Sequence, residues 1–209
     1  AVVEAGFTSI RDAGGSRLLD IGLREAVKDG LVPGPRMKVS GKGLSITGGH
    51  GDNFFPPEII FTDRYVVDGP DEVRKAARQQ LRDGADCIKL HATGGVMSEK
   101  DEPTSRGLTV EEMRAAIEEA KNVGAKTLSH AQGTQGIKNA IIAGINSIDH
   151  GFYLDDEAIE LMIKHDVFMV PTLCAVYHIV VNGEKMGIPE YGVRKAKIAQ
   201  AAHLASFRK

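Results

Sequence analysis

The sequence contains little cysteine and carries no excess of charge of either sign. Only two cysteines, Cys87 and Cys174, occur among 209 residues, and their wide separation argues against a disulfide framework or a cysteine-based zinc site. We interpret both as reduced. Lys and Arg number 26 and Asp and Glu 28, which gives a formal net charge of -2. A balance of this kind predicts no nucleic-acid partner.

Long apolar runs are also absent, since none approaches the roughly 20 residues that span a bilayer. We therefore expect no membrane association, and no signal peptide is visible. The chain starts AVVEAGFTSIRDAGG, without Met, and stops inside the helical pattern KAKIAQAAHLASFRK. We expect both ends to be cut. The compartment is therefore unknown, with the cytoplasm as the default.

The sequence does contain a regular alternation of short apolar runs with helical patterns. The expected strands are Phe7–Arg11, Arg36–Ser40, Cys87–His91, Thr127–His130, Ser147–His150 and Phe168–Pro171. A helix is expected from Pro70 to the Gly at 84, because Pro favours the first turn and Gly follows the end. Thr109 and Glu112 form a capping box at the start of a second helix. A third helix is expected to start at Asp155.

This alternation predicts an α/β fold with parallel strands and right-handed crossovers. An open doubly wound sheet and a closed barrel both fit it. No G-x-G-x-x-G or Walker-type loop follows a strand. Polar residues instead end strand after strand, as in (β/α)₈ barrels, which usually need about 250 residues. We predict a single partial barrel domain over residues 1–209, with a long active-site loop at residues 41–69.

Three consecutive expected strands end in residues that can bind a metal: Lys89, His130 and His150. A lone His in this position is more often a hydrogen-bonded structural residue. Two histidines on adjacent strands favour a metal site, because imidazoles are ligands of Zn²⁺. The buried Lys beside them supports this interpretation, since burying a Lys is costly unless it is paired, deprotonated or modified.

The motifs around these residues resemble those of the amidohydrolase superfamily. IKLHATGGVMS, LSHAQGTQGI and SIDHGFYLDD carry the resemblance, together with GFTSIRDAGG and GPRMKVSGKGLSITGGHGD. They are most similar to the imidazolonepropionase-related branch, which contains Xaa-Pro dipeptidases and related carboxypeptidases. The resemblance implies a TIM-type (β/α)₈ barrel of which this chain supplies strands two to seven.

The resemblance also implies a binuclear metal centre. Lys89 matches the family's carboxylated lysine, which bridges two divalent metals, with zinc as the default. His130 and His150 match two further ligands. The family's His-x-His pair is absent, and its general-base Asp is expected beyond the C-terminus. No catalytic acid or base is therefore assigned within the chain.

Further polar residues receive weaker predictions. The candidates for substrate binding are His50, His91, Gln132 and Tyr177. Gln132 stands where related dipeptidases often carry an aromatic residue, which weakens a proline-dipeptide assignment. We expect Asp149 to face the helix layer because it flanks His150. His165 and His203 are expected on helix surfaces.

The main hypothesis is a metal-dependent hydrolase of peptide or N-acyl amino acid amide bonds, a dipeptidase or carboxypeptidase. One alternative is a barrel lyase in which Lys89 forms a Schiff base. The other is an inactive truncated barrel. Six strands leave two open edges, from which we expect a homo-oligomer.

Overall fold

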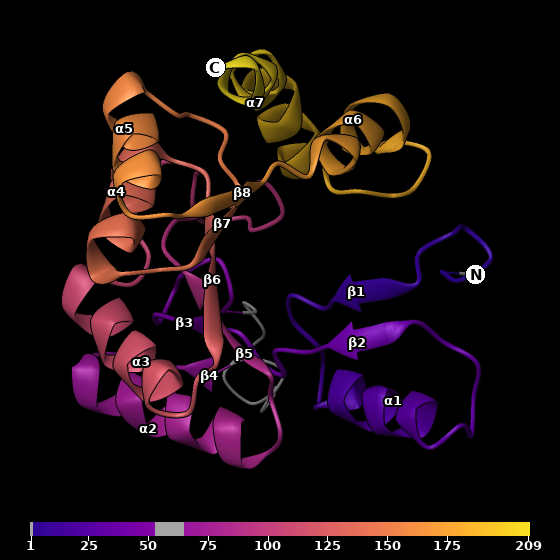
Figure 1. Ribbon diagram of the computed structural model, residues 1–209. Coiled ribbons are helices and arrows are strands. Elements are labelled where there is room, and N and C mark those ends of the chain that lie inside the picture. Colours follow the sequence, from indigo (N-terminus) through magenta and orange to yellow (C-terminus); the bar gives the residue numbers. More distant parts are fainter. Residues whose placement is uncertain (1, 53–64) are drawn as a thin grey trace, which may run out of the picture.

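The computed structural model describes residues 2–52 and 65–209 (Figure 1). Its strands are β1 (Ser9–Arg11), β2 (Arg36–Lys38), β3 (Leu44–Ser45), β4 (Tyr65–Val66), β5 (Cys87–His91), β6 (Lys126–Ala131), β7 (Ser147–His150) and β8 (Phe168–Val170). Its helices are α1 (Leu19–Lys28), α2 (Pro70–Arg82), α3 (Val110–Asn122), α4 (Thr134–Ala143), α5 (Asp156–Lys164), α6 (Leu173–Asn182) and α7 (Glu190–Arg208).

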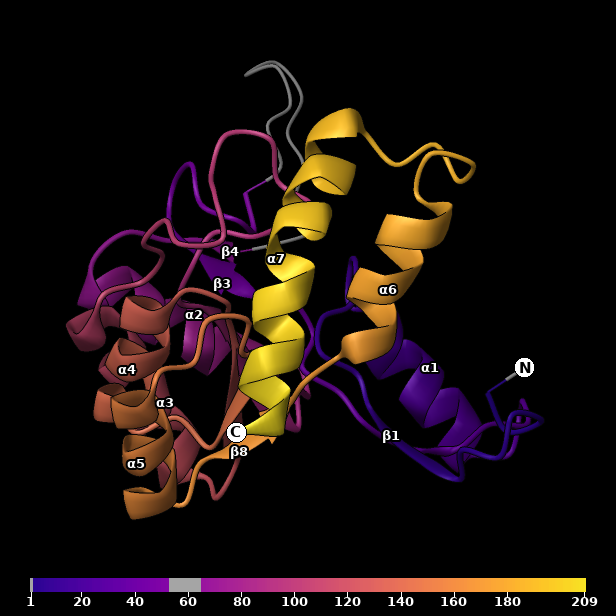
Figure 2. The same ribbon diagram turned by 90° about the horizontal axis from the view of Figure 1, so that it is seen from above.

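All paired strands of these elements run parallel, as predicted. A six-stranded sheet has the order β4-β3-β5-β6-β7-β8, and β1 and β2 form a separate pair. Figure 2 shows α2, α3, α4 and α5 together on one side of the strands. A doubly wound sheet carries helices on both faces, whereas a barrel wall carries them on its outer face alone. The arrangement is that of a barrel wall.

The predicted helix boundaries are confirmed. Pro70 opens α2, and Gly84, just past its end, has a φ of +101° that favours glycine. Both halves of the capping box form at α3, because Thr109 accepts from the Glu112 amide while the Glu112 carboxylate accepts from the Thr109 amide. Asp155 caps α5 by accepting from the Ala158 amide at 2.8 Å.

The main core lies between the six-stranded sheet and its helices. Ile88 and Leu90 of β5 are fully buried there, against residues such as Met113 and Ile117 of α3. Side chains alternate along a strand, so Cys87, Lys89 and His91 point to the opposite, inner side. The burial of alternate apolar residues therefore fixes which polar residues face the inside of the wall.

The predicted loop at residues 41–69 contains two short strands, β3 and β4, while residues 53–64 lie outside the described part. The helical pattern at the end of the chain forms α7. Figure 1 shows α6 and α7 as a pair beyond β8, apart from the other helices. Within the described ranges no helix is both long and apolar enough to cross a bilayer.

Candidate functional site

The register of the sheet brings the predicted residues to one edge. His91 pairs with His130, and His130 with Asp149, across β5, β6 and β7. Laterally paired residues of a parallel sheet point to the same side. Lys89, His91 and His130 therefore all face the inside, at the carboxyl ends of their strands.

His150 reaches the same site by a different route. It pairs with Ala131, whose side chain belongs to the core on the helix side. A regular strand would send His150 there too, but its φ is +81°. This left-handed backbone turns the ring back to the inside. Asp149 keeps the regular inward orientation, so the expectation that it faces the helix layer is wrong.

Four imidazoles gather at this edge, and we call His50, His91, His130 and His150 the histidine cluster. The His130 ring stacks on His50 with centroids 4.1 Å apart and meets His150 edge-on at 4.7 Å. His91 lies 5.7 Å from His130 and 5.8 Å from His50. The structure thus brings together residues that are as much as 100 positions apart in the sequence.

Hydrogen bonds orient the two predicted histidine ligands. His130 Nε2 lies 2.8 Å from the Gly94 carbonyl oxygen. A carbonyl only accepts, so the His130 proton sits on Nε2 and the Nδ1 lone pair is the one able to ligate. His150 Nδ1 contacts the Thr172 hydroxyl at 2.6 Å, which leaves Nε2 as its ligating atom.

Burial keeps these imidazoles neutral. It lowers the pKa of His130 well below 6.5 and the pKa of His150 to about 3. Nearby charges act in the same direction, because protonated neighbours would repel one another. Neutral imidazole is the form that binds a metal.

Lys89 is the buried cation of the site. Its Nζ lies 2.5 Å from Asp149 Oδ2, and both side chains are at most 7% exposed. Arg11 from β1 also reaches Asp149 Oδ1 at 3.1 Å and the Ser147 hydroxyl at 2.8 Å. Burial lowers the pKa of Lys89, although the Asp149 carboxylate opposes this shift. Arg11 was not singled out from the sequence, although a basic residue at the end of a strand was an available signal, and Asp149 was assigned to the wrong side of the sheet.

A cavity of about 680 Å³ opens onto these residues. Its lining includes Lys89, Asp149 and all four members of the histidine cluster. Gln132 is buried but does not line the cavity, and Tyr177 lies on α6, 56% exposed, beside a separate small cavity. In the described residues no group of three His, Cys, Asp or Glu side chains could hold a metal ion.

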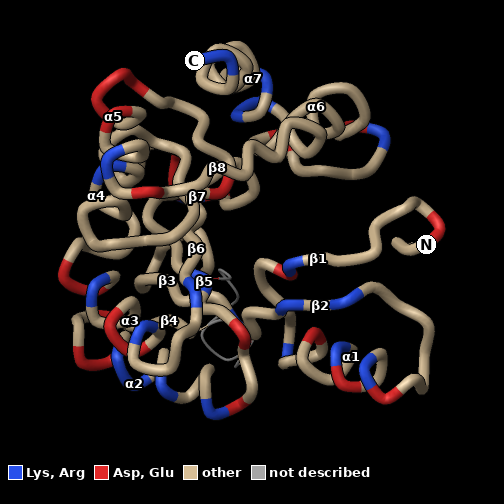
Figure 3. The backbone as a smooth tube through the Cα atoms, in the orientation of Figure 1, with Lys and Arg blue, Asp and Glu red and all other residues tan. Residues whose placement is uncertain are grey.

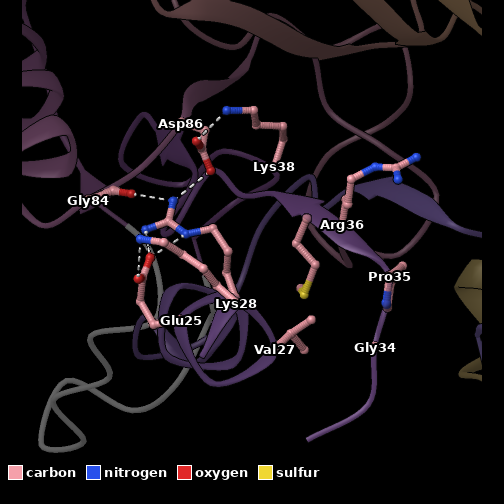
Figure 4. A pocket seen from close by; sticks show the side chains of 11 residues that line it. Glu25, Val27, Lys28, Gly34, Pro35, Arg36, Lys38, Gly84 and Asp86 are labelled. Atoms are coloured by element: carbon pink, nitrogen blue, oxygen red, sulfur yellow. Dashed lines mark hydrogen bonds and ion pairs between the residues drawn. The ribbon is translucent and has the colours of Figure 1, made fainter. Parts of the chain in front are cut away.

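Another cavity, of about 770 Å³, is lined by residues of α1, of β2 and of the turn before β5 (Figure 4). Asp86 binds Arg24 at 2.6 Å and Lys38 at 2.9 Å, which joins α1, β2 and the start of β5. These charges satisfy one another, so we assign them a structural role. Figure 3 likewise shows acidic and basic residues interspersed along α1, α2 and α3.

A parallel barrel wall with histidines and a buried lysine at the carboxyl ends of its strands is the arrangement of β/α-barrel enzymes. The chain belongs to the amidohydrolase family, whose model matches residues 1–202. It is 33% identical over 223 aligned positions to ochratoxinase from Aspergillus niger, covering 99% of this chain and 45% of that protein.

Two solved structures extend the comparison. A Xaa-Pro dipeptidase with methionine bound in its active site is 38% identical, with a TM-score of 0.90 over 98% of this chain and 52% of its own. A prolidase in complex with N-methylphosphonate-L-proline is 36% identical, with a TM-score of 0.90 over 99% and 52%. The chain thus spans about half the length of these relatives. The predicted superfamily and barrel fold are confirmed.

Proposed function

We propose that the protein containing this chain is a metal-dependent hydrolase of amide bonds. The substrate would be a dipeptide or an N-acyl amino acid, cleaved to release a free C-terminal amino acid. The observation that carries the proposal is the convergence of neutral His130 and His150 with buried Lys89 at one cavity. The prolidase and dipeptidase relatives, whose bound molecules are a proline derivative and an amino acid, support the substrate class.

The donor set fits a pair of divalent cations, with Zn²⁺ as the default. Lys89, His130 and His150 would hold them, and the remaining ligands are expected outside this chain. When bound, such ions acidify water and polarise a carbonyl. His130 would contribute Nδ1 and His150 Nε2, because their other ring nitrogens already contact Gly94 and Thr172.

Lys89 would serve as a carbamate. Burial lowers its pKa, so the neutral amine is easier to form than in an exposed lysine; that amine adds CO₂ and loses a proton to give an anionic oxygen donor. This would add an anionic oxygen donor to the two imidazoles at the cavity. Arg11 would then neutralise Asp149, which it already contacts at 3.1 Å.

Substrate contacts would come from the rest of the cavity. His50 and His91 line it, and hydrogen bonds hold both rings: His50 contacts the Ser98 hydroxyl at 2.7 Å and His91 the Leu44 carbonyl at 2.9 Å. These bonds fix the rings and so reduce the entropy lost when a polar substrate is bound. Gln132 and Tyr177 do not line this cavity, so they could bind substrate only if the substrate extends beyond it.

The test is metal analysis of the purified protein together with hydrolysis of a panel of dipeptides and N-acyl amino acids. We expect bound transition metal and release of a free amino acid, both lost in Lys89→Met and His130→Ala but kept in Lys126→Met, an exposed lysine of β6. Undetectable metal together with no hydrolysis would refute the proposal.

A further inference from the structure

The buried face of α7 carries polar side chains that bind the loops around the site. Lys195 contacts the loop after β5, His203 Nε2 contacts the Pro171 carbonyl at 2.6 Å, and the Ser206 hydroxyl donates to the Phe152 carbonyl at 2.7 Å. His203 is only 1% exposed, so its predicted surface position is wrong. Both views show α7 beside β8 (Figures 1 and 2). A helix that merely covered a core would present apolar groups here.

Lys195 makes the most extensive of these contacts. Its side chain is 0% exposed, and Nζ contacts the carbonyl oxygens of Gly95 at 3.2 Å, Ser98 at 2.6 Å and Asp101. An ammonium group has three donors, and three carbonyls use all of them. The Asp101 carboxylate, 3.8 Å away, provides the opposite charge. A buried charge with this many partners is costly to remove.

The carbonyls that hold Lys195 belong to the segment that orients two members of the histidine cluster. Residues 94–101 provide the Gly94 carbonyl bound by His130 and the Ser98 hydroxyl bound by His50. Ser98 also donates its only proton to the Asp101 carboxylate. Its oxygen must therefore accept from His50 Nδ1, which fixes the His50 tautomer.

We propose that Lys195 is a positioning residue for the histidine cluster. Its ammonium holds residues 94–101 in place, and this segment sets the orientation and the proton position of His130 and His50. The consequence for metal binding rests on the proposed function, whereas the ordering of the segment does not. A neutral side chain of the same length would remove the ammonium donor from three buried carbonyls.

The test compares Lys195→Met with Lys197→Met, an exposed lysine on the same helix that pairs with Glu184 at 3.3 Å. In the metal-free protein we expect amide hydrogen exchange at residues 94–101 to rise at least about tenfold in Lys195→Met and to stay unchanged in Lys197→Met. In Co²⁺-loaded protein we expect a changed visible absorption spectrum in Lys195→Met alone. Unchanged exchange and an unchanged spectrum in folded Lys195→Met would overturn the proposal.

Ser98→Ala provides a second measurement if Lys195→Met does not fold. It keeps the carbonyls around Lys195 but removes the hydroxyl that binds His50. We expect the NMR signals of the His50 ring to shift while exchange at residues 94–101 stays near the wild-type rate; an unchanged His50 ring would overturn the proposal. A wild-type protein that binds no Co²⁺ would refute the proposed function alone, because the exchange comparison needs no metal.

Discussion

Removing the Lys89 ammonium tests whether the site depends on its buried ion pair with Asp149. Lys89→Met keeps the length of the side chain but leaves a carboxylate that is 5% exposed without its partner at 2.5 Å. Breaking a buried pair costs about 3–5 kcal/mol. Arg11, 34% exposed, still reaches Asp149 at 3.1 Å, so we expect a loss of about 2–3 kcal/mol.

The assay is urea unfolding of metal-free protein at neutral pH without added bicarbonate. Asp149→Asn alone leaves the ammonium unpaired and should also destabilise. The double variant should lose less stability than the sum of the two single variants, by at least about 1 kcal/mol, because neither charge is left alone. Full stability in Lys89→Met, or additive losses, would refute the assignment of a coupled buried pair.

Three further predictions follow from other contacts. The pKa of His150 is about 3 in the folded protein and 6.5 in the unfolded reference, so the unfolded state binds more protons between these values. The free energy of unfolding should therefore decrease as the pH is lowered, by about 2 kcal/mol between pH 7 and pH 5. His150→Asn should make this pH dependence, measured by urea unfolding, less steep. Thr109→Ala removes the capping box of α3 and should cost about 1 kcal/mol in thermal unfolding, while an unchanged midpoint would contradict the cap's role. Borohydride with carbonyl substrates should leave Lys89 unmodified by mass spectrometry; a trapped adduct would favour the Schiff-base lyase.

The sequence predicted the parallel wall and its polar edge because both depend on local patterns. Apolar residues such as Ile88 and Leu90 alternate with Lys89, and this alternation sets which side faces the helices. Pro70 and Thr109 marked helix starts through chemistry that acts within one turn. The positions of Lys89 and His130 followed from these signals.

Other features depend on tertiary contacts that no local pattern contains. The predicted orientation of Asp149 was wrong because the left-handed backbone of His150 interrupts the alternation of side chains along β7. Asp149 and His150 therefore face the same side although they are neighbours in the sequence. His203 was wrongly expected at the surface because the face of α7 that it occupies binds loop carbonyls and mixes polar with apolar residues. The strands β3 and β4, with two residues each, are too short to give a periodic signal.

The central claim is that His130 and His150 bind metal at the carboxyl ends of neighbouring strands. It is tested most directly by the metal content of His130→Ala/His150→Ala protein, measured by plasma mass spectrometry. The matched control is His165→Ala/His178→Ala, since both of these histidines are exposed and lie outside the cavity. We predict metal in the wild type and the control and its loss in the site variant. Equal metal content in all three proteins would contradict the claim.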